Sequence, residues 1–256
     1  MSLAPTTILL LCGASLLAGL VDAIAGGGGL LTVPALLAAG LPPELALGTN
    51  KGQAVFGSGG ALLRFARAGL VDRRMGRVTF PAGFVGSLAG AGLVLLLPPA
   101  VLRPVVLVLL VVVAVVLSLR PSAPAPRPGA GARARPLRVA AAIAAVVGAY
   151  DGFFGPGTGT FLIFGFVVFL GLRLQEASAD AKVVNFASNL AAMLLFAGRG
   201  LVVWSVALPM AAGQFAGATL GAHLAVRGGD RLVRWVVLAV VSALALKLGG
   251  DLLRGG

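Results

Sequence analysis

The chain has 256 residues, of which 59% are hydrophobic and 11% are charged, and its mean hydropathy is +1.03. A soluble domain of this size has no interior large enough for so much apolar surface, so the composition excludes a soluble fold and predicts an all-α polytopic membrane protein. The net charge of +12 does not indicate nucleic-acid binding. Seventeen of the twenty basic residues are arginines, mostly in short loops between apolar runs, where basic residues keep loops in the cytoplasm.

Apolar runs predict five helical elements in the first half of the chain, at 5–21, 30–40, 44–63, 78–97 and 101–119. The second element has only about ten residues, which is too short to cross a hydrocarbon core of about 30 Å at about 1.5 Å per residue. With the first element and the glycines between them, it predicts a re-entrant or discontinuous helix pair.

The second half of the chain repeats the first. Residues 40–117 align with 171–248 without a gap, which places Lys51 on Lys182, and a slightly smaller shift places Asp22 on Asp151. Charged residues in register are not explained by chance matches between apolar runs. We therefore expect two homologous membrane repeats of about five helical elements each, with 8–10 membrane segments in all. They cover residues 1–119 and 138–256 and are joined by a basic Pro/Ala/Arg-rich cytoplasmic linker at 120–137.

The arginine distribution predicts how the repeats are oriented. The loop at 64–77 and the linker are both arginine-rich and are separated by two helices, so both can face the cytoplasm. In the second half, the loop equivalent to 64–77 contains only Arg199, and the next loop, 227–234, is basic instead. This displacement by one helix favours inverted repeats. The alternative is a single broken crossing in each half, which gives parallel repeats.

Two glycine-rich stretches, "DAIAGGGG" (22–29) and "DGFFGPGTGT" (151–160), occupy matching places in the repeats. Unwound backbone at membrane depth must be buried by protein or line a watery cavity, and its amides and adjacent helix N-terminus favour an anion. Close helix packing is the alternative interpretation. The candidate substrate-binding residues in these stretches are Gly26, Gly27, Gly28, Gly29, Gly155, Gly157 and Thr158.

Lys51 and Lys182 are two of only three lysines, and both lie inside apolar segments. A charge in such a segment costs at least roughly 2.5–3.5 kcal/mol on insertion scales and is functional by default, although snorkelling to the interface is an alternative. Polar residues accompany them: Ser58 lies at i+7 from Lys51, Asn185 and Asn189 lie at i+3 and i+7 from Lys182, and Asn50 flanks Lys51. We expect the two lysines and these residues to bind substrate.

Asp22 and Asp151 lead the two glycine stretches. They can carry protons, pair with the lysines or cap the short helices, and we favour capping and ion pairing over proton coupling. Asp180 has Thr49 at the equivalent position of the other repeat, so we expect any role of Asp180 to break the symmetry. Two small-residue faces, Gly86-x-x-x-Gly90 and Gly213-x-x-x-Gly217-x-x-x-Gly221, predict close helix packing.

The stretches "VDAIAGGGGLLTVPALLAAGLPPELALGTNK" and "YDGFFGPGTGTFLIF…AKVVNFASNLAA" resemble the sulfite exporter TauE/SafE family of bacterial inner-membrane permeases. The resemblance covers almost the whole chain. It implies a multi-pass protein of the bacterial inner membrane that exports small sulfur-containing anions such as sulfite or sulfoacetate, driven by an ion gradient. The family pattern falls on Asp22, Gly26 to Gly29, Pro34, Thr49, Asn50, Lys51, Asp151, Gly155 to Gly157, Lys182, Asn185 and Asn189.

We therefore expect a secondary transporter that binds a small anion between the glycine-loop amides and the two lysines near the membrane midplane. Its expected partners are that anion and the lipid bilayer, without nucleic acid, cofactor or metal, and a homo-oligomer is left open. No nucleotide-binding motif is present, and we expect no enzymatic activity. The alternatives are an anion channel and a non-transporting membrane assembly or scaffold protein.

Overall fold

The computed structural model describes residues 3–118 and 136–253, and every regular element in these ranges is a helix. The helices are α1 (Pro5–Ala25), α2 (Gly29–Ala38), α3 (Pro43–Arg67), α4 (Arg73–Leu96), α5 (Pro99–Ser118), α6 (Leu137–Phe153), α7 (Thr158–Leu170), α8 (Leu174–Gly198) and α9 (Trp204–Leu253). Of these, α1, α4 and α8 are long and apolar enough to cross a membrane by length and composition. The prediction of an all-α polytopic membrane protein is confirmed.

The predicted bounds of the first five helices differ from the observed ones by a few residues. The largest shift is at the start of α4, where the apolar run begins at position 78 but the helix begins at Arg73. Asp72 caps this helix, because its side chain accepts hydrogen bonds from the backbone N–H groups of Arg74 and Met75. A capped first turn can be polar, so hydropathy alone does not find it. The predicted linker at 120–137 lies outside the described residues except for Pro136 and Leu137.

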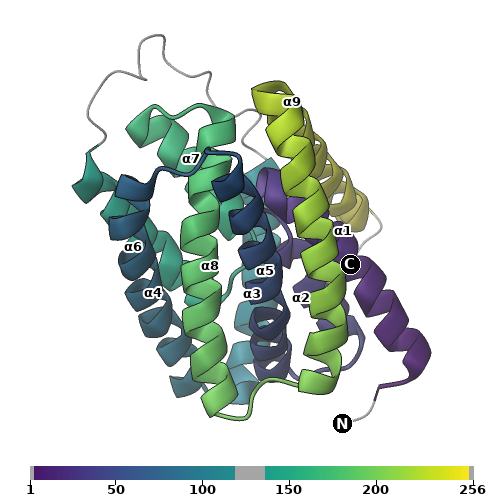
Figure 1. Cartoon of the computed structure of the whole chain (residues 1–256). Helices are drawn as coiled ribbons and strands as arrows, with labels where there is room; N and C mark the ends of the chain where they lie inside the picture. The colour runs from purple at the N-terminus through teal and green to yellow at the C-terminus, as the bar shows by residue number, and fades with distance from the viewer. Residues whose placement is uncertain (1–2, 119–135, 254–256) are drawn as a thin grey trace.

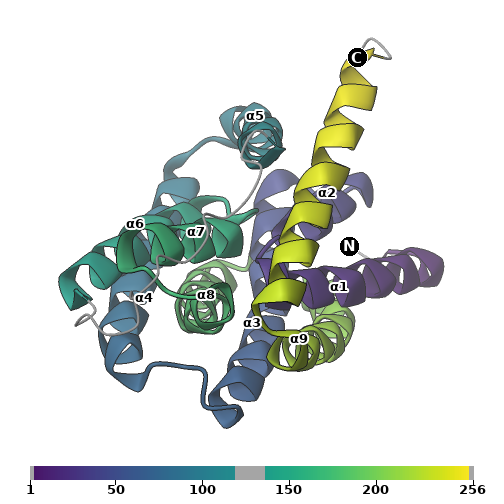
Figure 2. The ribbon, with the colours of Figure 1, turned by 90° about the horizontal axis from the view of Figure 1, so that it is seen from above.

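Helices α3 and α8 lie side by side at the centre of the molecule (Figure 2). Around them, α1 packs along α9, and α4 packs along α6 (Figure 1). Each of these outer pairs joins a helix from before the linker to one from after it. The two halves of the chain are therefore interleaved rather than arranged as separate domains.

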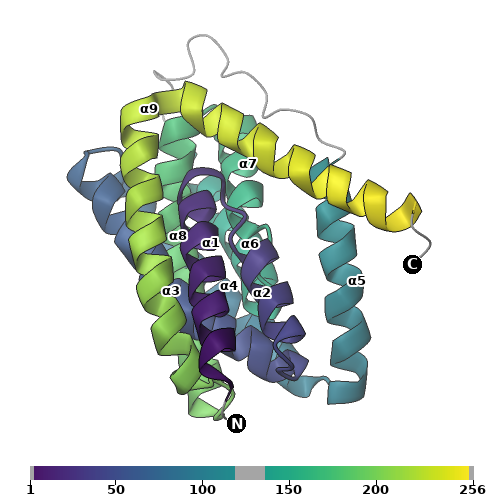
Figure 3. The same cartoon turned by 90° about the vertical axis from the view of Figure 1, so that its right-hand side faces the viewer.

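The short helices α2 and α7 turn back beside the helices that precede them. Helix α1 starts, and α2 ends, at the end of the molecule where the N-terminus lies (Figure 3). Helix α6 starts, and α7 ends, at the opposite end (Figure 1). Each pair thus enters and leaves the bundle at one end, as a re-entrant pair does.

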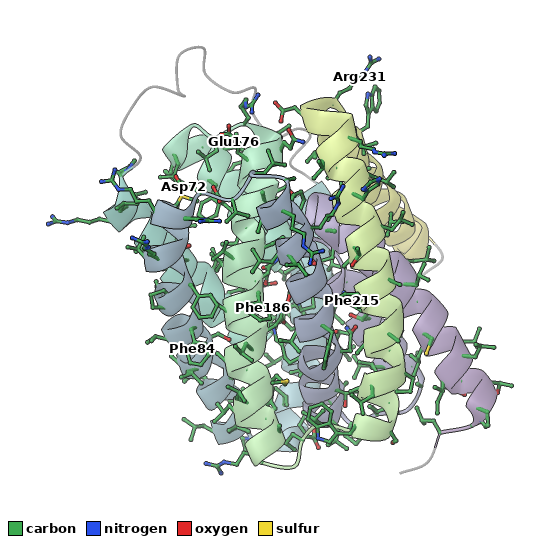
Figure 4. The ribbon with its side chains drawn as sticks, in the orientation of Figure 1. Asp72, Phe84, Glu176, Phe186, Phe215 and Arg231 are labelled. Carbon is green, nitrogen blue, oxygen red and sulfur yellow. The ribbon has the colours of Figure 1, made fainter. Side chains whose placement is uncertain are left out.

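Asp72, Glu176 and Arg231 all lie at the end of the molecule opposite the N-terminus (Figure 4). This end, called here the basic end, therefore carries the α3–α4 loop and the region around 227–234. Helix α9 bends there, because Gly229 has a left-handed φ of 57° that interrupts the helical backbone. The segment beyond Gly229 runs obliquely across the basic end, whereas α5 stands beside the bundle (Figure 3). The side of the membrane that this end faces stays a prediction.

Close glycine contacts hold the outer helix pairs together. A Cβ atom at Gly86 of α4 would overlap the carbonyl oxygen of Ala145 on α6, and one at Gly217 of α9 would overlap the carbonyl oxygen of Leu16 on α1. The proposed repeat alignment relates these two contacts to each other residue for residue. The predicted role of these glycines in helix packing is confirmed.

Asp180 and Thr49 make equivalent hydrogen bonds in the two halves of the chain. Asp180 Oδ1 accepts a hydrogen bond from the backbone N–H of Asp72 at 2.8 Å, and Thr49 Oγ1 accepts one from the backbone N–H of Val203 at 3.0 Å. Each side chain holds the loop that leads into the next outer helix. The expectation that a role of Asp180 breaks the symmetry is therefore wrong, because a hydroxyl and a carboxylate both accept a backbone N–H.

Candidate functional site

Lys51 is buried inside the bundle and is bound by groups from the second half of the chain. Its Nζ lies 2.7 Å from Oδ1 of Asp151 and donates to Asn189 Oδ1 at 3.2 Å. Thr158 Oγ1 donates to the same Asp151 oxygen at 2.9 Å, and Ser188 Oγ donates to the other oxygen. Both charges are thus paired and hydrogen-bonded, which is the condition for burying them at tolerable cost.

Lys182 forms the corresponding ion pair with the first half of the chain. Its Nζ lies 2.8 Å from Oδ2 of Asp22 and also donates to the Asp22 backbone carbonyl. The other carboxylate oxygen of Asp22 accepts the backbone N–H of Gly28 at 3.3 Å, at the start of α2. The Asp22 side chain is 18% exposed, whereas the side chain of Lys182 is fully buried. Asp22 therefore acts as ion-pair partner and as the anion at a helix N-terminus.

The two glycine loops meet each other. Gly26 has a left-handed φ of 81°, and a Cβ atom there would overlap the backbone of Gly159. Across this contact, the backbone N–H of Thr160 donates to the Gly26 carbonyl at 3.2 Å. Only glycine permits this approach of two backbones, so here the loops serve close packing as well as any ligand.

The carbonyls at the end of α1 are satisfied by side chains from α7 and α8. Thr160 Oγ1 donates to the carbonyl of Ala25 at 2.8 Å, and Ser178 Oγ lies 3.1 Å from the carbonyls of both Ala23 and Ile24. The end of a helix normally leaves such carbonyls without partners. In this protein they are used to fix α1 to the other half of the chain.

A small cavity of about 30 Å³ lies between the two loops and the central helices. It is lined by Asp22, Gly26, Gly29, Thr32, Asn50, Lys51, Gln53, Ala54, Asp151, Gly155, Thr158, Gly159, Asn185, Asn189 and Gln214. The volume is enough for one or two water molecules. An anion of several non-hydrogen atoms needs a wider cavity than this one.

Most of the predicted site residues line this cavity, but five do not. Lys182 lies outside its lining, behind Asp22, and Gly27, Gly28 and Gly157 are also absent from it. Ser58 is buried and donates to the carbonyls of Ala54 and Val55 in its own helix. Ser58 therefore lies on a helix that lines the cavity, as predicted, but its hydroxyl binds the backbone of its own helix and not the cavity.

Residues absent from the predicted set also line the cavity, among them Thr32, Gln53 and Gln214. Thr32 Oγ1 donates to Asn50 Oδ1 at 2.6 Å, and Gln53 Nε2 donates to the same oxygen at 3.0 Å, which links α2 to α3. Gln214 directly follows Gly213, which belongs to the small-residue face of α9, but its own side chain lies against Gly57 of α3. An amide side chain inside an apolar helix was the signal that could have identified it.

Comparisons with known proteins agree with this picture of a membrane transporter. The family model described as sulfite exporter TauE/SafE matches residues 11–248. A probable membrane transporter protein, ORF9, from Sinorhizobium is 38% identical over 238 residues, which cover 93% of this chain and 90% of that protein. The probable membrane transporter protein YfcA of Escherichia coli K12 is 38% identical over 234 residues, covering 91% and 86%. A probable membrane transporter protein of Haemophilus influenzae is 36% identical, with 91% of each chain covered. No solved structure matches the chain.

Proposed function

The chain belongs to the sulfite exporter TauE/SafE family and is a multi-pass membrane transporter of the bacterial inner membrane, and from this premise we propose that it exports a small anion. The proposed substrate is sulfite or an organosulfonate such as sulfoacetate, and the proposed class is a secondary transporter. The observation that carries this proposal is the buried Lys51–Asp151 pair beside a cavity that glycine loops and amide side chains line.

Lys51 supplies the positive charge for the anion. It lines the cavity, and its Nζ already binds one oxyanion, the carboxylate of Asp151. An ammonium group that holds a carboxylate has the charge and the donors to hold a sulfite or sulfonate group instead. We therefore propose that the substrate competes with Asp151 for Lys51, while Thr158 and Ser188 continue to hold the aspartate through their hydrogen bonds.

The ion pairs also supply a means to couple binding to movement. Lys51 pairs with Asp151, and Lys182 pairs with Asp22, so each pair bridges the two interleaved halves. A substrate that weakens one bridge removes a restraint on the relative motion of the halves. In the proposed transport cycle, this motion opens the cavity alternately to the two sides of the membrane.

The test is anion efflux from proteoliposomes that contain the purified protein. We expect sulfite efflux to saturate with concentration and to be strongly reduced at low sulfite concentration in the Lys51→Ala variant. Unchanged flux and apparent affinity in both Lys51→Ala and Lys182→Ala would show that the site is wrong. Flux that neither saturates nor responds to an imposed ion gradient would instead indicate an anion channel.

A further inference from the structure

Three amide side chains that line the cavity have side-chain oxygens without hydrogen-bond partners. Gln53, Asn185 and Gln214 all line the cavity, and none is more than 3% exposed. The side-chain oxygen of each is buried without a hydrogen-bond partner. Buried polar atoms without partners are uncommon and cost stability, so three around one small cavity require an explanation.

The hydrogen bond of Gln53 fixes which of its amide atoms remains available. Its Nε2 donates to Asn50 Oδ1 at 3.0 Å, and that oxygen also accepts from Thr32. The oxygen of Gln53 is therefore the atom left over. A side-chain oxygen can only accept, so the missing partner is a donor or a positive charge.

The fold itself does not require these glutamines. In the repeat alignment, Val184 stands opposite Gln53, and Gly83 stands opposite Gln214. These two equivalent positions, on α4 and α8, pack together without polar atoms, because a Cβ atom at Gly83 would lie 2.8 Å from Val184 Cγ1. The same architecture is thus filled by apolar contact on one side and by amides on the other. This difference points to a ligand rather than to packing.

The charges around the cavity indicate the sign of that ligand. Lys51, Lys182, Asp22 and Asp151 sum to zero, and they pair within the protein. An anion added to a neutral, buried site leaves it with an uncompensated negative charge, which is costly at low dielectric. A cation that binds together with the anion removes this cost.

We propose that Gln53, Asn185 and Gln214 form a subsite for a monovalent alkali cation such as sodium, which binds together with the transported anion. This inference rests on the proposed function. Carbonyl-type oxygens are the ligands that hard cations prefer, and the carboxylate of Asp22 lines the same cavity. The carbonyls at the end of α1 are already bonded to Thr160 and Ser178, so the amide oxygens are the acceptors that remain for the cation. A cavity with room for one or two water molecules can hold a bare alkali cation but not choline.

The first experiment measures cation binding without transport. Thermal unfolding of the purified protein in detergent is followed by its tryptophan fluorescence in sodium chloride, potassium chloride and choline chloride at equal ionic strength. Sodium at saturation should raise the melting temperature by about 5 °C relative to choline, and the potassium sample shows how selective the subsite is. Equal melting temperatures in sodium and choline would overturn the proposal.

Variants locate the subsite. Gln214→Leu should unfold near the wild-type temperature in choline but lose the sodium response, because it removes an oxygen that has no partner in the protein. Gln214→Glu retains an oxygen at this position and should keep or strengthen the response. Thr79→Val is the matched control, since Thr79 Oγ1 is also buried without a partner but does not line the cavity. Loss of the sodium response in Thr79→Val, or its persistence in Gln214→Leu, would contradict the assignment.

The second experiment separates this inference from the proposed function. Sulfite flux in proteoliposomes is measured with inward or outward sodium gradients and with choline in place of sodium. We expect flux to fall about tenfold or more without sodium. Flux that is unaffected by sodium but follows a pH gradient would assign the compensating charge to a proton and would overturn the inference while leaving anion transport intact. If sodium stabilises the protein but no sulfite or sulfonate moves, the proposed function is the part that fails.

Discussion

Lys51 on α3 and Asp151 on α6 form a 2.7 Å ion pair in which both side chains are almost completely buried. Lys182 on α8 and Asp22 on α1 are paired in the same way at 2.8 Å. Each lysine therefore finds its counter-ion in the other half of the chain. The charges that make each half unsuited to the bilayer by itself are neutralised only when the halves interleave, which links assembly of the fold to formation of the site.

Removal of one partner of the Lys51–Asp151 pair should be strongly destabilising. In Asp151→Ala the ammonium of Lys51 keeps its hydrogen bond to Asn189 but loses its counter-ion. The expected loss is about 3–5 kcal/mol, the usual cost of an uncompensated buried charge. Thermal unfolding of the detergent-purified protein measures it.

The control removes both charges. Lys51→Met with Asp151→Leu should recover most of the lost stability, because an apolar pair can replace a buried ion pair at little cost. Thr158 and Ser188 retain acceptors in this variant, the carbonyls of Gly155 and Asn185. A double variant as unstable as Asp151→Ala would show that the loss does not come from the unpaired charge.

The two lysines should differ in their effects on transport. Lys51 lines the cavity, whereas Lys182 lies behind Asp22 and binds both its carboxylate and its carbonyl. We expect Lys51→Met to weaken the apparent affinity for sulfite by about 10- to 100-fold, the value of a charged hydrogen bond. We expect Lys182→Met to lower the melting temperature and to weaken that affinity less than Lys51→Met does, because its charge acts on the anion only through Asp22.

Concentration-dependent efflux and unfolding of the same preparations distinguish these outcomes. Lys247→Met, which replaces the only other lysine of the chain, controls for loss of one positive charge. An equal loss of affinity in Lys51→Met and Lys182→Met would contradict the different roles assigned to the two lysines.

The sequence predicts the helices well because lipid imposes long apolar runs with few exceptions. It also predicts that lysines and glycine loops converge, since charges and unwound backbone are tolerated in a membrane only where protein surrounds them. The sequence does not predict which aspartate pairs with which lysine. Lys182 and Asp22 are 160 residues apart, and their pairing depends on how α1 packs beside α8.

The same limit explains the errors at individual residues. Ser58 has the helical spacing of a site residue, but a serine in a helix can donate to a carbonyl of the preceding turn, and this one does. Gln214 directly follows Gly213 of a face that the pattern identifies with packing, and the packing is real, since Gly213 and Gly217 contact α1. One turn of helix can serve both roles, and sequence spacing does not separate them.

Alanine substitutions of three glycines should distinguish the cost of a strained backbone φ from the cost of steric overlap between the two glycine loops. Gly13 has open space at its Cβ position, Gly40 has open space but a φ of 88°, and Gly26 has a φ of 81° and the Gly159 backbone in the way. Gly13→Ala should be neutral or slightly stabilising, and Gly40→Ala should cost about 1–3 kcal/mol through backbone strain. Gly26→Ala should cost clearly more than Gly40→Ala in thermal unfolding. Equal losses at Gly26 and Gly40 would mean that the two loops are not in contact.

Two exposed glycines give a direct test of the orientation of the repeats. Gly69, between α3 and α4, and Gly200, between α8 and α9, occupy equivalent positions in the repeat alignment. They have nearly equal φ angles, 71° and 69°, and open space around them, so cysteine should cost each the same. The α3–α4 and α8–α9 loops that contain them lie at opposite ends of the molecule (Figure 1).

The measurement uses Gly69→Cys and Gly200→Cys in a Cys12→Ser background, with a membrane-impermeant maleimide applied to intact and to opened cells. The arginines around the α3–α4 loop predict that Gly69→Cys reacts only in opened cells, because basic loops stay in the cytoplasm. Gly200→Cys should react in intact cells. Parallel repeats would place both cysteines on the same side, so identical labelling would contradict the inverted arrangement. Opposite labelling would fix the basic end, and with it the re-entrant pair of α6 and α7, at the cytoplasmic face.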